Sequence, residues 1–241
     1  MEKIFLYIKQ GKGHGLLFLL ATAIVITIVF LFSIKTVIDD IKPKALLVAE
    51  DFLPIEIKNQ EIVSHPDTYK RVDLNFGITD KDNFILPVIL DTKNSPEELT
   101  KEKTAIIITK KYFYITSPSD IKKLEYTDGT YDINYFKSFL DKSIQSTTST
   151  FSLLAICLFF IILLLKSLIL TFLNSLILKI RKTPINKEIL MRLSTLCISF
   201  IELLNLLIAK TINLEINELS TFLLAFLLSL IYLKNNIEKQ E

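Results

Sequence analysis

Apolar blocks of bilayer length are the feature that most constrains how this chain can fold. The block Leu16–Ile34 is uninterrupted, and as a helix it covers roughly 28 Å, close to the hydrocarbon thickness of a membrane. The block Phe151–Leu178 covers roughly 42 Å, enough to cross with a tilt. Together with Ile189–Ala209 and Leu219–Leu233, these blocks predict four transmembrane helices.

The first block is expected to be an uncleaved span over residues 16–38, preceded by a short segment, 1–15. A cleaved signal peptide has a shorter apolar core and small residues before its cleavage site. Here the sequence after the block reads KTVIDDIKPK, which offers no such site. The mean hydropathy of +0.43 agrees with a membrane protein.

Residues 39–150 are polar, mixed in charge and patterned mostly like strands. Apolar and polar residues alternate on both sides of Lys58-Asn59-Gln60, which predicts a hairpin, and Asp128-Gly129 between tyrosines predicts a second. NFILPVILDT and TAIIITKKYFYITS each indicate a strand, and NYFKSFLDKSIQ indicates a short amphipathic helix. The predicted fold class is therefore an α+β membrane protein, with four transmembrane helices and a small β-rich extracytoplasmic domain between spans 1 and 2.

Basic residues mark the connections that we expect in the cytoplasm. The segment before the first block has three lysines against one glutamate, and the loop 179–188 has four basic residues before its glutamate. The loop 210–218 has one lysine and two glutamates. Because basic short loops stay inside, spans over 151–178, 189–209 and 219–233 would leave both termini, including the tail 234–241, in the cytoplasm.

The order of parts resembles a family of bacterial four-span membrane proteins of unknown function, some of which are labelled maltodextrin-utilisation proteins. The resemblance is carried by KQGKGHG before the first block, by FLPIEIKNQEIV, and by the PVILDT and AIIITKKYFYI strands. Gln60 stands where that family's turn would have glycine. The resemblance implies a bacterial cytoplasmic membrane as the location, and it supplies no catalytic residues.

Two opposite charges interrupt sequential apolar blocks at similar depth. Lys166 lies roughly 18 Å, and Glu202 roughly 20 Å, from the cytoplasmic ends of their spans. Since each charge costs about 2.5–3.5 kcal/mol near the bilayer centre, we expect them to pair. A packing pair that fixes the bundle is favoured over a substrate or proton path with Asn174 and Asn205, because the spans contain no glycine or proline. A snorkelling lysine beside a protonated Glu202 is a further alternative.

In the middle segment, tyrosines are the candidate contact residues: Tyr112, Tyr114, Tyr126 and Tyr131. They indicate either a sugar-stacking platform or, as we favour, cross-strand contacts. No catalytic residue, cofactor site or metal site is predicted, because the 2 cysteines and 2 histidines are scattered and no EF-hand spacing occurs. The net charge of +2 gives no case for nucleic acid, and KIRK is expected to bind anionic lipid headgroups.

These observations leave three hypotheses. The first is a non-enzymatic integral membrane protein whose outer domain binds a partner or senses an external signal, with the lipid bilayer and other membrane proteins as partners. The second is an accessory subunit of a transporter, for instance for sugar uptake, which only the labels on similar proteins suggest. The third, and least favoured, is a membrane enzyme acting on lipid or cell-wall material.

Overall fold

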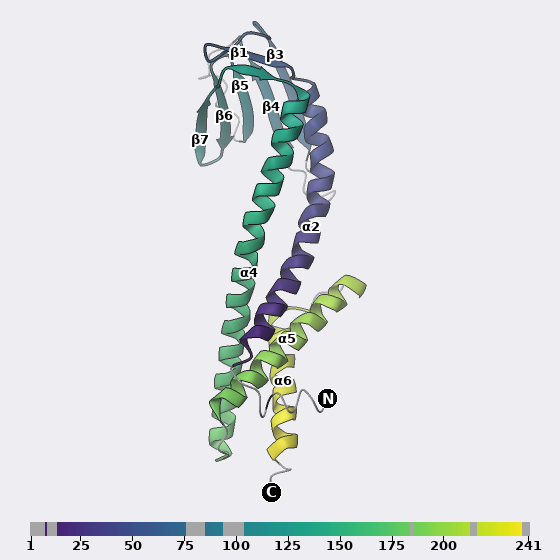
Figure 1. Cartoon of the computed structure of the whole chain (residues 1–241), viewed down its shortest axis with the longest axis vertical. Helices are drawn as coiled ribbons and strands as arrows, with labels where there is room; N and C mark the ends of the chain where they lie inside the picture. The colour runs from purple at the N-terminus through teal and green to yellow at the C-terminus, as the bar shows by residue number, and fades with distance from the viewer. Residues whose placement is uncertain are drawn as a thin grey trace. The chain divides into compact units, whose positions relative to one another are not determined.

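The structure is a computed structural model that describes residues 8, 14–75, 85–93, 104–183, 186–212 and 216–237. The chain divides into two compact units, which are described separately. The helical unit comprises Met1–Ser33 and Thr148–Glu241, and the sheet unit comprises Ile34–Thr147. Two long helices, α2 (Leu16–Glu50) and α4 (Ile133–Ile180), contribute residues to both units (Figure 1).

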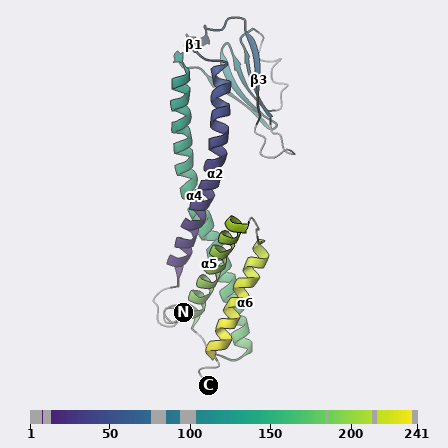
Figure 2. The same cartoon turned by 90° about the vertical axis from the view of Figure 1, so that its right-hand side faces the viewer.

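The helical unit contains the first part of α2, most of α4, and the helices α5 (Lys187–Ile212) and α6 (Glu218–Ile237). α5 and α6 run side by side in opposite directions (Figure 2). Buried leucines and isoleucines from all these helices form one core, which includes Leu19, Leu170, Leu193 and Ile198. Phe30 and Phe159 add an edge-to-face contact with ring centroids 6.1 Å apart.

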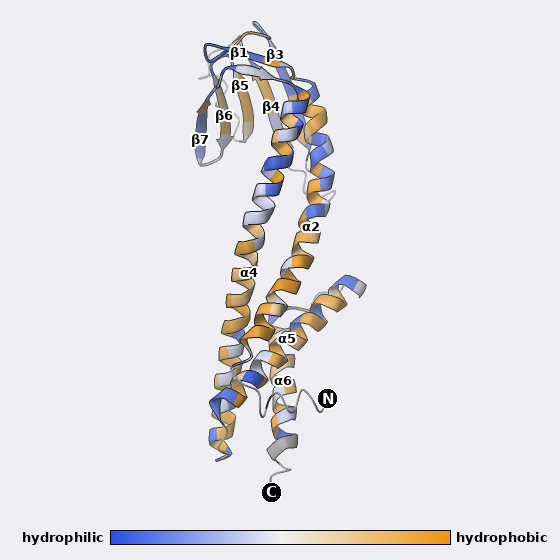
Figure 3. Ribbon diagram, viewed as in Figure 1, coloured by the Kyte–Doolittle hydropathy of each residue, from blue (hydrophilic) through white to orange (hydrophobic). Residues whose placement is uncertain are grey.

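Large apolar side chains also cover the outside of the helical unit. Leu153, Phe172, Leu207 and Ile231 are each more than half exposed, and apolar residues follow one another along α4, α5 and α6 (Figure 3). An exterior of this kind is typical of a surface that contacts lipid. Three described helices, α2, α4 and α5, are long and apolar enough to cross a membrane.

The prediction of four spans is wrong, because only these three helices qualify among the residues that the structure describes. The fourth predicted span, Leu219–Leu233, lies inside α6, which is 20 residues long. Its apolar stretch covers only about 22 Å at the helical rise, short of the roughly 30 Å of hydrocarbon. The strands expected in the middle segment do form, as two sheets between α2 and α4.

The sheet unit contains a sheet of three strands in the order β2 (Glu61–Ile62), β1 (Ile55–Lys58) and β8 (Gly129–Tyr131). A second sheet has five strands in sequence order, namely β3 (Tyr69–Asn75), β4 (Ile85–Asp91), β5 (Ala105–Thr109), β6 (Tyr112–Ser117) and β7 (Asp120–Glu125). Only β4 and β5 pair in parallel within this sheet. The end of α2 and the start of α4, where Lys42 and Asp141 form an ion pair of 2.5 Å, complete the unit.

The hairpin predicted at Lys58-Asn59-Gln60 is confirmed. β1 and β2 are antiparallel with Lys58 opposite Glu61, and Asn59 and Gln60 have φ values of 52° and 62°. Both central residues are thus left-handed, as a type I′ turn requires. The Asp128 carboxylate accepts hydrogen bonds from both of their backbone N–H groups, at 3.0 and 2.8 Å.

The hairpin predicted at Asp128-Gly129 does not form. β7 pairs with β6, whereas β8 pairs with β1 in the other sheet, so this segment connects the two sheets. The run TAIIITKKYFYITS is likewise not one strand. It folds back at Lys110-Lys111 into β5 and β6, with Ile108 opposite Phe113.

Candidate functional site

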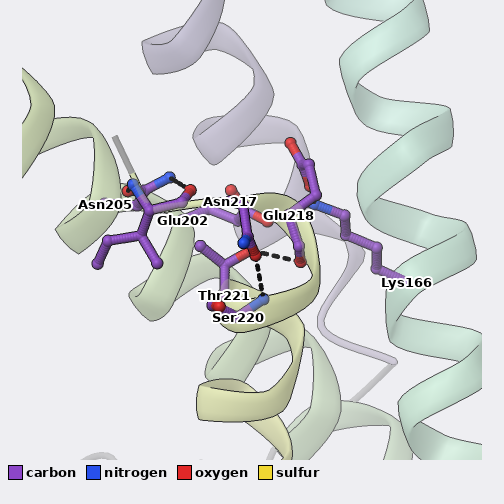
Figure 4. A network of polar contacts seen from close by, with 8 residues as sticks. Lys166, Glu202, Asn205, Asn217, Glu218, Ser220 and Thr221 are labelled. Carbon is purple, nitrogen blue, oxygen red and sulfur yellow. Dashed lines mark hydrogen bonds and ion pairs between the residues drawn. The ribbon is translucent and has the colours of Figure 1, made fainter. Parts of the chain in front are cut away.

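A charged cluster in the helical unit joins three helices. The Lys166 ammonium on α4 lies 2.6 Å from a carboxylate oxygen of Glu202 on α5 and also binds Glu218, the first residue of α6 (Figure 4). The side chains of Lys166 and Glu202 are 17% and 12% exposed, whereas that of Glu218 is 80% exposed. The structure thus brings together the two residues proposed as a pair and adds a second carboxylate.

The start of α6 is held beside this cluster by amide side chains. Asn205 on α5 accepts a hydrogen bond from the Ile216 N–H at 3.2 Å and donates one to the Ile216 carbonyl at 3.3 Å. Asn217 caps α6, because its side-chain oxygen accepts from the Ser220 N–H at 2.8 Å (Figure 4). Two backbone groups of Ile216 and one N–H group in the first turn of α6 are therefore hydrogen-bonded to side chains.

Glu218 is the residue of this cluster that the sequence reasoning missed. The sequence predicts it at the end of the loop 210–218 between two spans. A helix-start signal was present, since Asn217 is a strong N-cap residue and an acidic residue in the first turn favours the helix dipole. With all three groups ionised, one ammonium faces two carboxylates, and the cluster carries one net negative charge.

Further contacts show how α5 and α6 lie along α4. The Thr171 hydroxyl is 3.3 Å from the Met191 sulfur on α5. The Ser229 hydroxyl on α6 donates to the buried Asn174 side-chain oxygen at 3.0 Å. Asn174, which was considered as part of a polar path, is therefore a contact between α4 and α6.

The candidate tyrosines of the sheet unit fall into two groups. Tyr112 and Tyr114 lie on one face of β6, with ring centroids 6.1 Å apart, and the Lys123 ammonium is 3.5 Å from the Tyr112 ring centroid. Tyr126 and Tyr131 lie elsewhere, on the wall of an apolar cavity. The four rings therefore do not form one stacking platform.

Tyr126 is tied to the sheet by its hydroxyl. The hydroxyl lies 2.8 Å from the Thr109 carbonyl oxygen and 2.9 Å from that of Tyr112, so its proton is shared between the two. Burial raises the pKa of this phenol well above its ordinary value. The hydroxyl is therefore already hydrogen-bonded, and it stays protonated at neutral pH.

The cavity has a volume of about 600 Å³ and is formed entirely within the sheet unit. Its walls come from the end of α2, the start of α4, one face of the five-stranded sheet, and the three strands of the smaller sheet. They include Phe52, Val88, Ile106, Ile108, Phe113 and Phe136. Glu125 and Thr127 are the polar residues without a ring among those that line it. Cavities of this size with mostly apolar walls are typical of sites for small molecules.

The burial of the lining side chains distinguishes a deep end from a mouth. Phe52 and Ile62 are almost fully buried at 3% and 2% exposure. Leu124, Tyr135 and Phe139 are 48%, 52% and 57% exposed, although each is largely apolar. The cavity therefore opens through half-exposed apolar side chains.

The described residues contain neither a disulfide nor a cluster of metal ligands. Cys157 and Cys197 are free thiols. Within the described ranges, no three His, Cys, Asp or Glu side chains come together as a metal site would require.

Comparison with known proteins gives one family match. A family model described as "Protein of unknown function (DUF1189)" matches residues 1–237, nearly the whole chain. No curated protein and no solved structure matches.

Proposed function

Since this chain belongs to the DUF1189 family of proteins of unknown function, we propose that it is a membrane-anchored binding protein whose sheet unit holds a ligand or partner. The helical unit anchors the chain, and no reaction is assigned to it. The observation that carries this proposal is the 600 Å³ apolar cavity of the sheet unit.

The state of the cavity wall supports binding rather than a purely structural role. Leu124, Tyr135 and Phe139 would be covered if the sheet unit were optimised only for its own packing, because exposed apolar side chains gathered at one place cost free energy in water. Covering them with a ligand recovers that free energy.

The membrane assignment rests on α2, α4 and α5, and the orientation rests on charge. Lys3, Lys9 and Lys12 precede the first apolar block, and Arg181 and Lys182 follow α4. Under the positive-inside rule these segments lie in the cytoplasm of a bacterial cell, and the sheet unit lies outside the membrane. The charge of the sheet unit does not oppose this, because long segments translocate largely regardless of charge.

The other two hypotheses have less support. A role as an accessory subunit for sugar uptake depends on the labels of similar proteins. Tyr126 and Tyr131 line the cavity apart from the other two tyrosines, so the four rings do not form one sugar-stacking platform. A membrane enzyme would need clustered nucleophilic or acid–base side chains in a cleft. The cavity wall is instead almost entirely apolar.

A photo-crosslinking experiment tests the proposal. A benzophenone amino acid replaces Leu124 at the cavity mouth, or Ile121 on the other face of the same strand, and intact cells are irradiated. Both side chains are 48% exposed, so the two positions are matched in access. We expect an adduct, of protein or of small molecule, at position 124 and not at position 121. Equal or absent adducts at both positions would refute the proposal.

A further inference from the structure

We infer that the occupant of the cavity is one hydrocarbon chain of a membrane lipid. This rests on the proposed function, and it names the ligand class. The first argument is chemical. Few polar atoms line the cavity, and the Tyr126 hydroxyl is already engaged by two carbonyl oxygens. A buried polar ligand would therefore leave its own donors and acceptors unsatisfied, which is costly.

The second argument concerns size. A volume of about 600 Å³ is within the range of small-molecule sites. A flexible chain of methylenes can follow the shape of such a space, and each methylene that it buries tightens binding by about fourfold.

The third argument is that the cavity has a closed end and an open end. Its deep end is closed by Phe52, Ile57 and Ile62, and its mouth is formed by Leu124, Tyr135 and Phe139. Thr127, a polar residue that also lines the cavity, lies three positions after Leu124 in the chain. Such a gradient suits a ligand with an apolar tail and a polar end that stays in water. Lipids have this form, and they surround any chain that carries membrane helices.

The test uses the full chain in vesicles of phosphatidylethanolamine and phosphatidylglycerol that contain a trace of a diazirine-bearing phosphatidylglycerol. Two probes are compared, one with the diazirine at the end of its acyl chain and one with it next to the headgroup. After irradiation, adducts are mapped by mass spectrometry. We expect the terminal diazirine to label residues around Phe52 and Val88, and the headgroup-proximal one to label residues around Leu124 and Phe139.

Matched variants make the result specific. Leu124→Glu places a charge at the mouth, and the yield of cavity adducts should fall about fivefold or more, because the ligand loses an apolar contact there and the new carboxylate repels the anionic headgroup of the probe. Ile121→Glu, at the same 48% exposure on the same strand, should leave the yield unchanged. Lipid adducts confined to the apolar blocks of α2 and α4 would overturn the inference. If position 124 still crosslinks to a protein in cells, the proposed function stands and only the ligand class is wrong.

A second inference comes from a separate observation, the register of α5 and α6 on α4. Lys166 meets Glu202 and Thr171 meets Met191, so α5 runs antiparallel to α4. Lys166 also meets Glu218, and Asn174 meets Ser229, so α6 runs in the same direction as α4. The part of α5 up to Glu202 and the helix α6 therefore lie along the C-terminal half of α4, and α6 begins beside Lys166.

Lys166 is near the middle of the apolar block of α4. It is about 22 Å from Phe151 and about 18 Å from Leu178 along the helix. We propose that α5 and α6 form a hairpin that enters the bilayer from the side of loop 181–186 and turns back within it. The length and composition of α5 would permit a full crossing, but its partner helix starts at mid-depth instead of on the far side.

The polar contacts at the start of α6 agree with this placement. Non-helical backbone at membrane depth is tolerated only where its polar groups are satisfied or lie next to water. Asn205 supplies both a donor and an acceptor to Ile216, and Asn217 caps the helix. Side chains thus satisfy polar groups of the described backbone at the start of α6, as a position inside a membrane requires.

Cysteine labelling tests the hairpin in a background where Cys157 and Cys197 are replaced by alanine. Single changes are made at Thr211 in the last turn of α5, at Ser119 in the sheet unit and at Arg181 after α4, all at exposed side chains. A membrane-impermeant maleimide is added to sealed vesicles of each orientation. We expect Thr211→Cys to resist labelling from the side that labels Ser119→Cys. Equal labelling of both from that side would show that α5 crosses completely, and would overturn the hairpin.

Discussion

Removing the Lys166 ammonium is the perturbation whose consequences follow most directly from the contacts. Lys166→Leu leaves Glu202, at 12% exposure, without its partner, and also frees Glu218. Breaking a buried pair from one side costs about 3–5 kcal/mol. Taking the lower value, because Lys166 and Glu202 are not fully buried, we expect a loss of about 3 kcal/mol. For a chain of this size that lowers the Tm by roughly 6–12 °C.

Combined variants separate the contributions of the two carboxylates. Lys166→Leu with Glu202→Leu should recover about half of the lost Tm, because Glu218 remains near the middle of α4 without an ammonium. Adding Glu218→Leu should recover most of the rest, since replacing all members of a buried ionic group by apolar residues is often neutral or stabilising. Replacing both glutamates by leucine while Lys166 is kept should lower the Tm, because the Lys166 ammonium is then left without a carboxylate partner.

The assay is the fraction of monodisperse protein that survives heating in detergent, measured by size-exclusion chromatography. Lys179→Leu, at an exposed position of the last turn of α4, is the control for exchanging lysine with leucine in this helix. It should change the Tm by no more than about 2 °C, as surface substitutions do. A triple variant that is no more stable than Lys166→Leu, or a Lys166→Leu variant as stable as the parent, would refute the pairing.

Three further predictions concern single contacts. Tyr126→Phe should lower the free energy of unfolding by about 1 kcal/mol at neutral pH, and it should also abolish a stability loss that begins as pH rises above about 10.0. In the folded state the raised pKa keeps this phenol neutral while the unfolded chain ionises, so its stabilisation is complete below that pH and is lost above it; denaturant unfolding at several pH values measures both effects. Asp128→Ala should destabilise the sheet unit by about 1–3 kcal/mol, because the Asn59 and Gln60 N–H groups lose a charged acceptor; an equal loss for Asp120→Ala, at an exposed position in β7, would contradict this. Asn205→Ala should cost about 1–3 kcal/mol by leaving two Ile216 backbone groups unpaired, and a Tm like that of the parent would show that water reaches the start of α6.

The sequence was sufficient to predict the elements whose signals are local. A turn such as Lys58-Asn59-Gln60 is predictable because the alternation on both sides sets the register and Asn tolerates a left-handed backbone. Asp128-Gly129 has an equally strong local signal, yet β7 and β8 belong to different sheets. Turn chemistry shows where a chain can reverse, whereas the partner strand depends on tertiary packing. Lys110-Lys111 shows the converse, because it reverses the chain without Gly, Asn or Pro.

The apolar cavity had no signature in the sequence. Its wall residues read as ordinary core positions of strands, since the apolar runs of β4 and β5 are typical of buried strands. Whether the cavity face of the sheet is filled depends on how much of it the end of α2 and the start of α4 cover. The half-exposed Tyr135 and Phe139 on α4 show that the cover is incomplete, and that depends on tertiary packing.

The span count and the Lys166 cluster have one physical cause. Counting spans by apolar length treats every block as a crossing, and it places Glu218 in a loop on the far side of the bilayer. α6 is too short to start there, and its first residue contacts Lys166 in the middle of α4. Depth along sequential helices was therefore enough to predict that Lys166 meets Glu202, because α5 follows α4 directly. It was not enough for Glu218, whose depth is set by where the chain turns back.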